Sequence, residues 1–362
     1  MSAEKLSVPG DSGVSTKDGA TTLDLPMPTD FHAHLRQGSG MPAYAARLAT
    51  VCGRALIMPN TIPPIATAAA VMEYRHQIEE ATGPDFVPLM SFKLLPGMSA
   101  QTVEACARAG ALAGKYYPCG TTTNAADGPR RPADVADALS AMEAAGTVLC
   151  VHAERPGAPS FQREKLFLPD IDLILRKWPR LRVVIEHVSS RETIDYILAG
   201  PDRLAGTITA HHLLFTVDDM LGDKLDPSLF CKPLVKFEED REALRAAAFA
   251  GSSRFFFGSD SAPHPASSKL ARRAPAGVYA APTGIPAVVG LFEEYGVLAT
   301  LPAFLAKNGV DFYRLSPAAG TLRLVRKPWQ VPEEIDGCIP LCAGRTLAWR
   351  LTTAAEATAP DN

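Results

Sequence analysis

Two histidines and one arginine stand at every second position of the segment DFHAHLR, as His32, His34 and Arg36. The run before it, residues 23–28, has the composition of a strand, so we place the three residues at the carboxyl end of that strand. Side chains two apart on a strand point the same way, and these three are therefore expected to share one face. Neutral imidazole is a common zinc ligand, and the two histidines could bind one ion. Two buried histidines bonded to the backbone would give the same pattern, so the pair alone does not establish a metal site.

Short apolar runs alternate with helical segments along most of the chain. The runs expected to be strands are residues 23–28, 55–60, 86–92, 111–117, 147–152, 181–187, 204–210 and 254–260. Helical composition is found between them, at residues 66–80, 100–109, 133–145, 173–178, 191–198 and 239–250. Continuous apolar runs separated by helices are typical of parallel strands covered on both faces, which gives the class α/β. About eight such units favour a closed (β/α)8 barrel, the TIM barrel, over an open sheet.

Polar residues fall at the ends of these apolar runs. They are His32, Asn60, Lys115, His152, His187 and Asp260. The carboxyl ends of the strands of such a barrel form one rim, where barrels place their chemistry. We therefore expect these side chains to meet at one site.

The composition of this rim indicates two metal ions. With His34 the rim has four histidines, and together with the aspartate and the lysine they exceed the ligands of one tetrahedral zinc. Two neighbouring cations need an anionic bridge, which an ammonium cannot supply. Burial lowers the pKa of a lysine toward the nucleophilic free base, and reaction with carbon dioxide would turn Lys115 into a carbamate that offers one oxygen to each metal. A solvated or ion-paired lysine is the ordinary alternative, and the position of Lys115 among five metal-type residues favours the bridge.

Six separate segments resemble those of one enzyme family. They are DFHAHLR (30–36), MPN (58–60), AGKYYP (113–118), VHAE (151–154), EHVSS (186–190) and GSDSAPH (258–264). Their order and approximate spacing resemble the dihydroorotases of the bacterial single-domain type, members of the amidohydrolase superfamily, over residues 23–350. The resemblance implies a barrel with two zinc ions. It also implies the reversible, water-releasing cyclisation of N-carbamoyl-L-aspartate to L-dihydroorotate, the third step of de novo pyrimidine biosynthesis.

The resemblance implies a role for each rim residue. His32 and His34 match ligands of the more buried zinc, His152 and His187 match ligands of the second zinc, and Lys115 matches the carboxylated bridge. Asp260 matches the aspartate that binds the first zinc and carries the proton. Such a pair of ions would give hydroxide near neutral pH, and Asp260 would pass its proton to the leaving ring nitrogen.

The substrates are anionic and need a carboxylate site. The planar guanidinium of Arg36 suits a carboxylate, although an isolated arginine is more often in a surface ion pair. Asn60, which alone would be taken as a turn residue, and His264 match the other carboxylate contacts of the family. The family also makes two backbone contacts to the ring, which match Lys232, where the bacterial type often has leucine, and Ala276, whose surroundings differ from the bacterial pattern.

Two further segments are candidates for modulating the site. Residues 117–124 resemble the mobile loop of the family, in which the hydroxyls of Thr122 and Thr123 would close on the substrate, and an ordinary solvated loop is the alternative. After His264, the cations Lys269, Arg272 and Arg273 could attract an anionic substrate or simply belong to a solvated loop. We expect His211 and His212 to be structural or to support the metal ligands.

Composition limits the other possibilities. A hydrophobic content of 47% and a net charge of -3 describe a soluble globular protein without the basic excess of nucleic-acid or membrane-surface binders. We find no apolar run of the ~18 residues that a membrane span needs. Seven cysteines without CxxC spacing indicate free thiols in a reducing compartment, so we expect a cytoplasmic protein. We expect a disordered leader (1–20), one barrel with a C-terminal cap (21–350) and a frayed tail (351–362). The family suggests a homodimer.

Three alternatives remain at this point. A hydantoinase or dihydropyrimidinase would share both metals and the bridging lysine, but its uncharged substrates do not require Arg36. A catalytically inactive barrel acting as a scaffold would be expected to lack a metal ligand, whereas every ligand is present here. A one-metal deaminase would leave Lys115 without a role.

Overall fold

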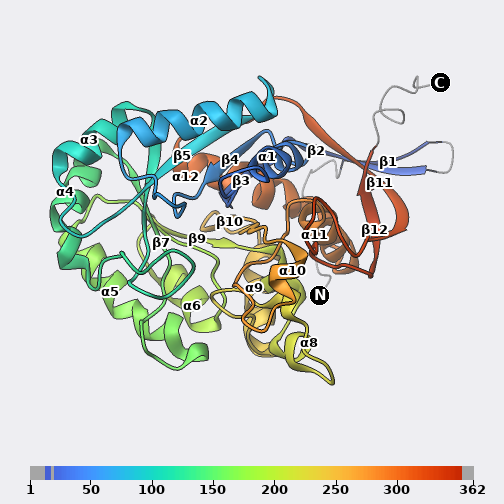
Figure 1. The fold of residues 1–362 in the computed structure, drawn as a ribbon. Coiled ribbons are helices and arrows are strands. Elements are labelled where there is room, and N and C mark those ends of the chain that lie inside the picture. Colours follow the sequence, from blue (N-terminus) through green and yellow to red (C-terminus); the bar gives the residue numbers. More distant parts are fainter. Residues whose placement is uncertain (1–12, 18–19, 353–362) are drawn as a thin grey trace, which may run out of the picture.

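The computed structural model describes residues 13–17 and 20–352 and contains a parallel eight-stranded sheet (Figure 1). Its strands, in spatial order, are β3 Thr29–Ala33, β4 Arg54–Ile57, β5 Val87–Lys93, β6 Ala111–Tyr116, β7 Val148–Val151, β8 Val183–Ile185, β9 Leu204–Ile208 and β10 Phe255–Phe257. The first and last strands meet just beyond their ends. There the Asp260 N–H donates to His32 O (2.9 Å) and the His34 N–H donates to Ser261 O (2.9 Å). The predicted barrel is therefore confirmed.

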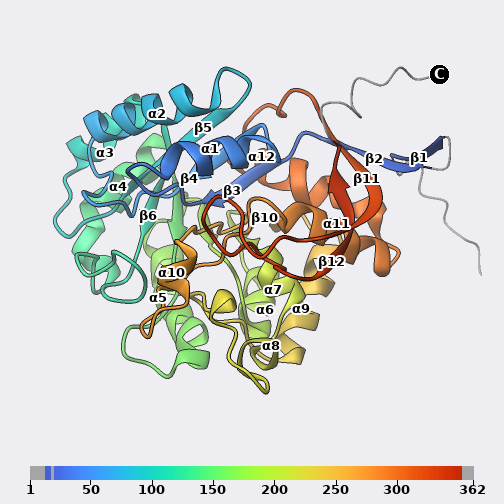
Figure 2. The same ribbon diagram turned by 45° about the vertical axis from the view of Figure 1, so that its right-hand side comes forward.

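Helices surround the barrel (Figures 1 and 2). Those expected from the sequence are α2 Ala68–Thr82, α3 Ala100–Arg108, α4 Ala136–Ala145, α5 Arg163–Lys177, α6 Arg191–Ala199 and α9 Glu238–Phe249. Thr67, Ser99 and Ser190 cap α2, α3 and α6 by accepting a backbone N–H from three residues further on. The structure adds α1 Met41–Ala49, α7 Ala210–Leu214, α8 Val217–Leu221, α10 Ala266–Lys269, α11 Gly284–Glu294 and α12 Asn308–Tyr313. No helix among the described residues is both long and apolar enough to cross a lipid bilayer.

The run at residues 23–28 is not the first barrel strand, contrary to our expectation. It lies largely in β2 Ala20–Pro26, which belongs to a second, antiparallel sheet, while the DFHAHLR segment itself supplies the barrel strand β3. Burial explains the difference. Leu23 and Leu25 are buried and alternate with the half-buried Asp24, as in a sheet with one wet face, whereas every residue of β3 is buried. Pro26 and Pro28, which lack a backbone N–H, separate the two strands.

Both ends of the described chain contribute strands to this second sheet, with β2 and β11 Thr321–Gln330 paired at its centre. Its remaining strands are β1 Val14–Lys17 and β12 Thr346–Leu351, and the spatial order is β1-β2-β11-β12. Strand β1 falls within the leader that we expected to be disordered. Residues 1–12 and 18–19 of the expected leader lie outside the described residues. Residues 353–362 of the expected tail lie outside them as well.

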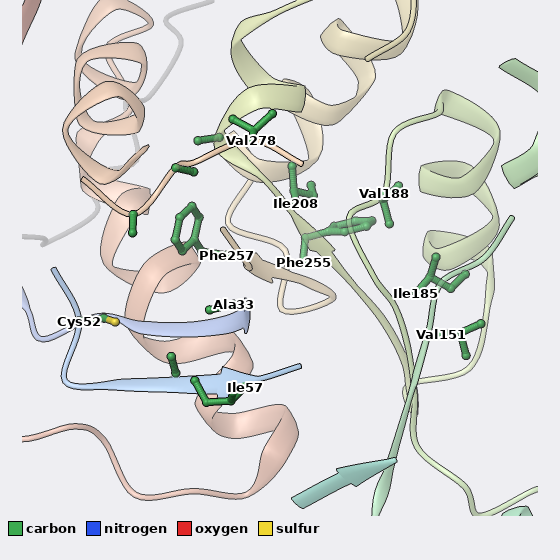
Figure 3. Packing of buried hydrophobic residues seen from close by; sticks show 14 of the residues in the cluster. Ala33, Cys52, Ile57, Val151, Ile185, Val188, Ile208, Phe255, Phe257 and Val278 are labelled. Atoms are coloured by element: carbon green, nitrogen blue, oxygen red, sulfur yellow. The ribbon is translucent and has the colours of Figure 1, made fainter. Parts of the chain in front are cut away.

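The barrel interior is apolar at the amino ends of the strands. Helix α12 closes this end, with the Tyr313 ring stacked on Phe31 at a centroid distance of 4.8 Å. Gly309 allows this close approach, because a Cβ there would lie 2.3 Å from the Phe31 ring. A second apolar layer fills the space between strands and helices, and Figure 3 shows part of it, including Ile57 and Phe257. With the amino end filled, the polar side chains of the barrel gather at the carboxyl end.

Candidate active site

A pocket of about 340 Å³ opens at the carboxyl ends of the strands. All predicted site residues except Lys115 and His264 line it: His32, His34, Arg36, Asn60, Thr122, Thr123, His152, His187, Lys232, Asp260 and Ala276. Tyr117, Ala262 and Gly277 complete the wall. Residues that are distant in the sequence are thus brought to one place, as the position of each after a strand predicts.

The first group of metal-type side chains is His32, His34 and Asp260. Asp260 Oδ1 lies 3.1 Å from His34 Nε2 and 3.4 Å from His32 Nε2, and all three residues are buried. His32 Nδ1 lies 2.8 Å from Glu186 Oε2, and the Thr207 hydroxyl donates to the same carboxylate oxygen. If His32 donates its Nδ1–H to Glu186, Nε2 remains a free lone pair directed at Asp260, which is the arrangement typical of metal-binding histidines.

The second group is His152 and His187. His152 Nε2 lies 2.8 Å from Glu154 Oε2, so that a proton on Nε2 would bond to this buried carboxylate. His152 Nδ1 then faces His187 Nε2 at 3.1 Å, and two imidazole nitrogens so close together could hold a cation between them. Burial lowers the pKa of both histidines, most strongly that of His187, and therefore favours the neutral ligand form.

Lys115 lies beneath the pocket, at the end of β6. Its side chain is fully buried, and its Nζ has no hydrogen-bond partner in the part of the chain that the structure describes. Burial lowers the pKa of Lys115, and the nearby Glu186 only partly opposes this effect. Unpaired buried ammonium groups are costly, so the environment favours a lysine that has lost its charge or has been converted to another group.

The protonation of Asp260 differs from that of its histidine neighbours. Burial alone would raise the pKa of Asp260, but the hydrogen bond with His34 and the charges of His32 and His34 hold it below its usual range. Burial lowers the pKa of His34 to about 4. Two imidazoles and a carboxylate form a donor set that suits a divalent cation such as zinc.

Arg36 reaches the pocket by a turn and not by strand alternation. Strand β3 ends at Ala33, and Arg36 has a left-handed backbone with φ of 62°. Our expectation that three residues share one strand face is therefore wrong in its geometry, although all three line the pocket. The guanidinium is held by Pro263 O, which accepts from Nε (3.0 Å), and by His264 Nε2, which lies 2.9 Å from Nη2. Burial, followed by the charge of Arg36, lowers the pKa of His264 to about 3, so the imidazole is neutral.

Backbone strain marks two more site residues. His187 has φ of 44° and Asp260 has φ of 43°. Residues other than glycine seldom adopt this left-handed region, and when they do they are often at functional sites. Each follows a short barrel strand, and the turn aims its side chain into the pocket.

The loop after β6 lies over the pocket. Asn60 Nδ2 donates to Thr123 O (3.1 Å), and Asn124 Nδ2 donates to Asn60 O (2.8 Å). Lys93 Nζ donates to Asn124 O (2.6 Å). These bonds place Thr122 and Thr123 at the pocket, while the expected mobility of the loop stays a prediction.

Several functional positions were not predicted. Glu154 and Glu186 hold the metal-type histidines, yet we assigned them no role although they stand within the VHAE and EHVSS segments. The sequence did contain a signal for both residues, because each carboxylate stands one or two residues from a candidate metal ligand. Lys269 does not line the pocket, because its Nζ donates to three backbone carbonyls instead.

A separate cluster contains His211, His212 and Cys231, whose potential ligand atoms lie within 4.8 Å of one another. His212 Nε2 and Cys231 Sγ both contact Pro233 O at 3.1 Å, and His212 Nδ1 contacts the Thr209 hydroxyl at 2.8 Å. His212 and Cys231 therefore already have protein partners, which fits the structural role expected for His212.

The sequence and the structure are similar to those of known dihydroorotases. No protein-family model matches the chain. A dihydroorotase of Leptothrix cholodnii is 42% identical over 340 residues, which cover 91% of this chain and 99% of the relative. A dihydroorotase structure from Campylobacter jejuni has a TM-score of 0.85 at 32% identity and covers 97% of this chain and 100% of its own. A Saccharomyces cerevisiae dihydroorotase in complex with 5-fluoroorotic acid also has a TM-score of 0.85 at 32% identity, covering 91% and 98%.

Hydantoinases share the fold at lower identity. The L-hydantoinase of Arthrobacter aurescens has a TM-score of 0.77 at 17% identity, which shows a common barrel and no more. The two dihydroorotase structures, at 32% sequence identity, and the Leptothrix relative, at 42%, are much more similar to this chain than the hydantoinase is. The chain belongs to the dihydroorotase family.

Proposed function

We propose that the chain catalyses the reversible cyclisation of N-carbamoyl-L-aspartate to L-dihydroorotate with loss of water, the third step of de novo pyrimidine synthesis. The observation that carries this proposal is that Arg36, whose guanidinium lies against His264, lines one pocket together with two groups of buried metal-type side chains. A cyclic-amide hydrolase acting on an acidic ring needs both features, since the ring carbonyl must be activated and the carboxylate must be bound.

We propose that two zinc ions occupy the site. His32, His34 and Asp260 would hold one, His152 and His187 would hold the other, and Lys115, carboxylated on Nζ, would bridge them. The buried Nζ without a partner among the described residues supports the bridge, and the carboxylate-bonded histidines support the ligand sets. When bound, the two cations would polarise the ring carbonyl and lower the pKa of a water molecule so that it can act as a nucleophile near neutral pH.

Asp260 is proposed to carry the proton. Its carboxylate is ionised, because the neighbouring histidines keep its pKa low, and it can therefore accept a proton. In ring opening it would receive the proton of the attacking water and deliver it to the leaving ring nitrogen. In ring closure it would accept the proton of the carbamoyl nitrogen, since the same groups must act in both directions.

Substrate binding is proposed to rest on five side chains and two peptide groups. Arg36 would bind the ring carboxylate, with Asn60 and His264 beside it. The backbone at Lys232 and Ala276 would contact the ring, and both residues line the pocket. Thr122 and Thr123 would close over the bound substrate.

The assay that tests the function compares two rings. Purified, metal-quantified protein should hydrolyse dihydroorotate and act poorly on dihydrouracil, the same ring without the carboxylate, as followed by ultraviolet absorbance. Arg36→Met should lower kcat/KM for dihydroorotate by about 100-fold, because hydrogen bonds to a charged group are lost. Its activity on dihydrouracil should change little. Equal turnover of both rings by the wild-type protein would contradict the proposed substrate.

The loop prediction concerns two hydroxyls. The double variant Thr122→Ala, Thr123→Ala should lower kcat about 10- to 100-fold while both metals stay bound, because two hydrogen bonds to the substrate are lost. Thr121→Ala is the matched control, since the Thr121 hydroxyl donates to Pro118 O within the loop and the residue does not line the pocket. Steady-state rates and metal content of each variant test this prediction. Wild-type rates in the double variant would refute the lid role of the loop.

We also propose, on the resemblance to the family, that the barrel with its cap (21–350) acts as one catalytic unit and that the protein is a cytoplasmic homodimer. Light scattering on the purified protein tests the dimer.

A further inference from the structure

Lys269 stands at the end of the short helix α10, close to the pocket but outside its wall. Its side chain is 3% exposed. The Nζ donates to Gly277 O (2.8 Å), Phe230 O (3.0 Å) and Pro275 O (3.2 Å). An ammonium has three N–H groups, and the three acceptors use all of them.

The three carbonyls belong to two loops that form the pocket wall. Phe230 precedes Lys232 by two residues, and Pro275 and Gly277 stand on either side of Ala276. Lys232, Ala276 and Gly277 line the pocket. The Gly277 N–H also donates to Phe230 O (2.9 Å), so the two loops lie against each other where Lys269 joins them.

The backbone at this junction has no room for a side chain. Gly277 has φ of 146°, and a Cβ there would lie 2.8 Å from Ala262 O. Because glycine is conformationally free, the arrangement of the peptide groups around it depends on the hydrogen bonds that surround them. A buried ammonium with three backbone acceptors is a strong constraint of this kind, because charged donors make shorter and stronger hydrogen bonds than neutral ones.

We propose that Lys269 is a positioning residue for substrate binding, whose ammonium fixes the spacing between the loop at Phe230–Lys232 and the loop at Pro275–Gly277. This inference rests on the proposed function, in which the peptide groups at Lys232 and Ala276 contact the ring. This positioning role differs from long-range attraction of an anionic substrate. The Lys269 ammonium donates to three backbone carbonyls, and the residue does not line the pocket.

The expected effect separates binding from turnover. Lys269→Met keeps an unbranched apolar stem, one atom shorter, but leaves three carbonyls without their donor, so the two loops should lose their fixed spacing. Contacts made equally in the ground state and the transition state raise KM when they are lost and leave kcat unchanged. We expect KM for dihydroorotate to rise at least tenfold at pH 7, with kcat within about threefold of wild type and both metals retained.

A matched control distinguishes positioning from long-range attraction. Arg272 and Arg273 are exposed cations on the same loop. If positive charge near the pocket were the cause, Arg272→Ala with Arg273→Ala would raise KM as much as Lys269→Met, and added salt would remove the difference. We expect the double arginine variant to keep KM within about twofold of wild type, and an equal rise in both variants would overturn the proposal.

The pH profile tests the same role without a substitution. Burial lowers the pKa of Lys269 to about 8, and the facing Cys231 and Asp226 oppose this shift. His264 and His211, the other titratable groups near it, have pKa values lowered to about 3 and about 4 by burial and are neutral above pH 7. As the pH rises through 8, Lys269 loses one of its three N–H groups, and KM of the wild-type protein should rise.

The closing experiment measures kcat and KM for dihydroorotate from pH 7 to 9.5 in wild type, Lys269→Met and the double arginine variant, with metal content and melting temperature for each. The ratio of KM between Lys269→Met and wild type should be large at pH 7 and fall toward pH 9.5. A ratio near one at pH 7 would overturn the inference. Absence of dihydroorotate turnover in wild type would instead refute the proposed function itself.

Discussion

Replacing Lys115 with alanine is expected to remove at least one metal ion and nearly all activity on dihydroorotate. The residue is fully buried and close enough to interact electrostatically with Asp260, His152 and His187, and in its carboxylated form it would give the site the negative charge that two adjacent cations require. Without that charge the cations repel each other, and the remaining ligands are divided between two separate groups. Metal analysis and the absorbance assay on the same preparation measure both effects.

Lys93→Ala is the matched control for this variant. Lys93 pairs with Lys115 in register on the neighbouring strand and is equally buried, but its Nζ is bound to Asn124 O and to Asp127. Its loss should disturb the loop over the pocket and leave both metals in place. A Lys115→Ala protein that retains both metals, or a crystal structure with an unmodified amine turned away from bound cations, would contradict the bridging role.

Asp260→Asn is expected to lower kcat by about 10²- to 10⁴-fold, the usual contribution of a positioned general acid or base. The amide has nearly the same shape as the carboxylate but can neither accept the proton nor give the site its negative charge. The measurement is kcat at pH 7 together with metal content, which separates the loss of proton transfer from the loss of a ligand.

A second carboxylate serves as the control for Asp260. Asp336 accepts hydrogen bonds from Arg47 and Tyr279 in another part of the molecule. Asp336→Asn should lower the melting temperature and leave kcat unchanged. An Asp260→Asn protein that holds both metals and turns over within tenfold of wild type would show that the proton takes another route.

The barrel was predictable because its strands are buried on both faces. Residues 111–116 and 204–208 are almost continuously apolar, and runs of this kind between helices are typical of parallel strands in a covered sheet. We placed the start of the barrel too early in the chain, because the polarity of residues 23–28 and 29–33 does not show that they form two separate strands. Only the pairing of β2 with β11, about 300 residues away, assigns the first part to another sheet. The short helices α7, α8 and α10 have too few residues to show a helical period.

The candidate site was predictable in its membership and less so in its geometry. A polar residue after an apolar run marks the rim of a barrel, which is how His152, His187 and Asp260 could be found. Hydrogen bonds between distant residues leave no such pattern. The sequence does not show that Glu186 reaches His32, nor that Lys269 turns away from the pocket toward three carbonyls.

The left-handed turns at Arg36, His187 and Asp260 restrict which amino acids these positions tolerate during evolution. A β-branched residue such as valine is strongly disfavoured in that backbone region, so it would cost folding free energy, of order 1–3 kcal/mol, before any loss of chemistry is counted. Glycine, asparagine and aspartate fit the same turns with less strain. The backbone conformation thus limits which amino acids can replace these three residues, independently of their chemical role. In a related barrel without catalytic activity, glycine at these positions would relieve the backbone strain.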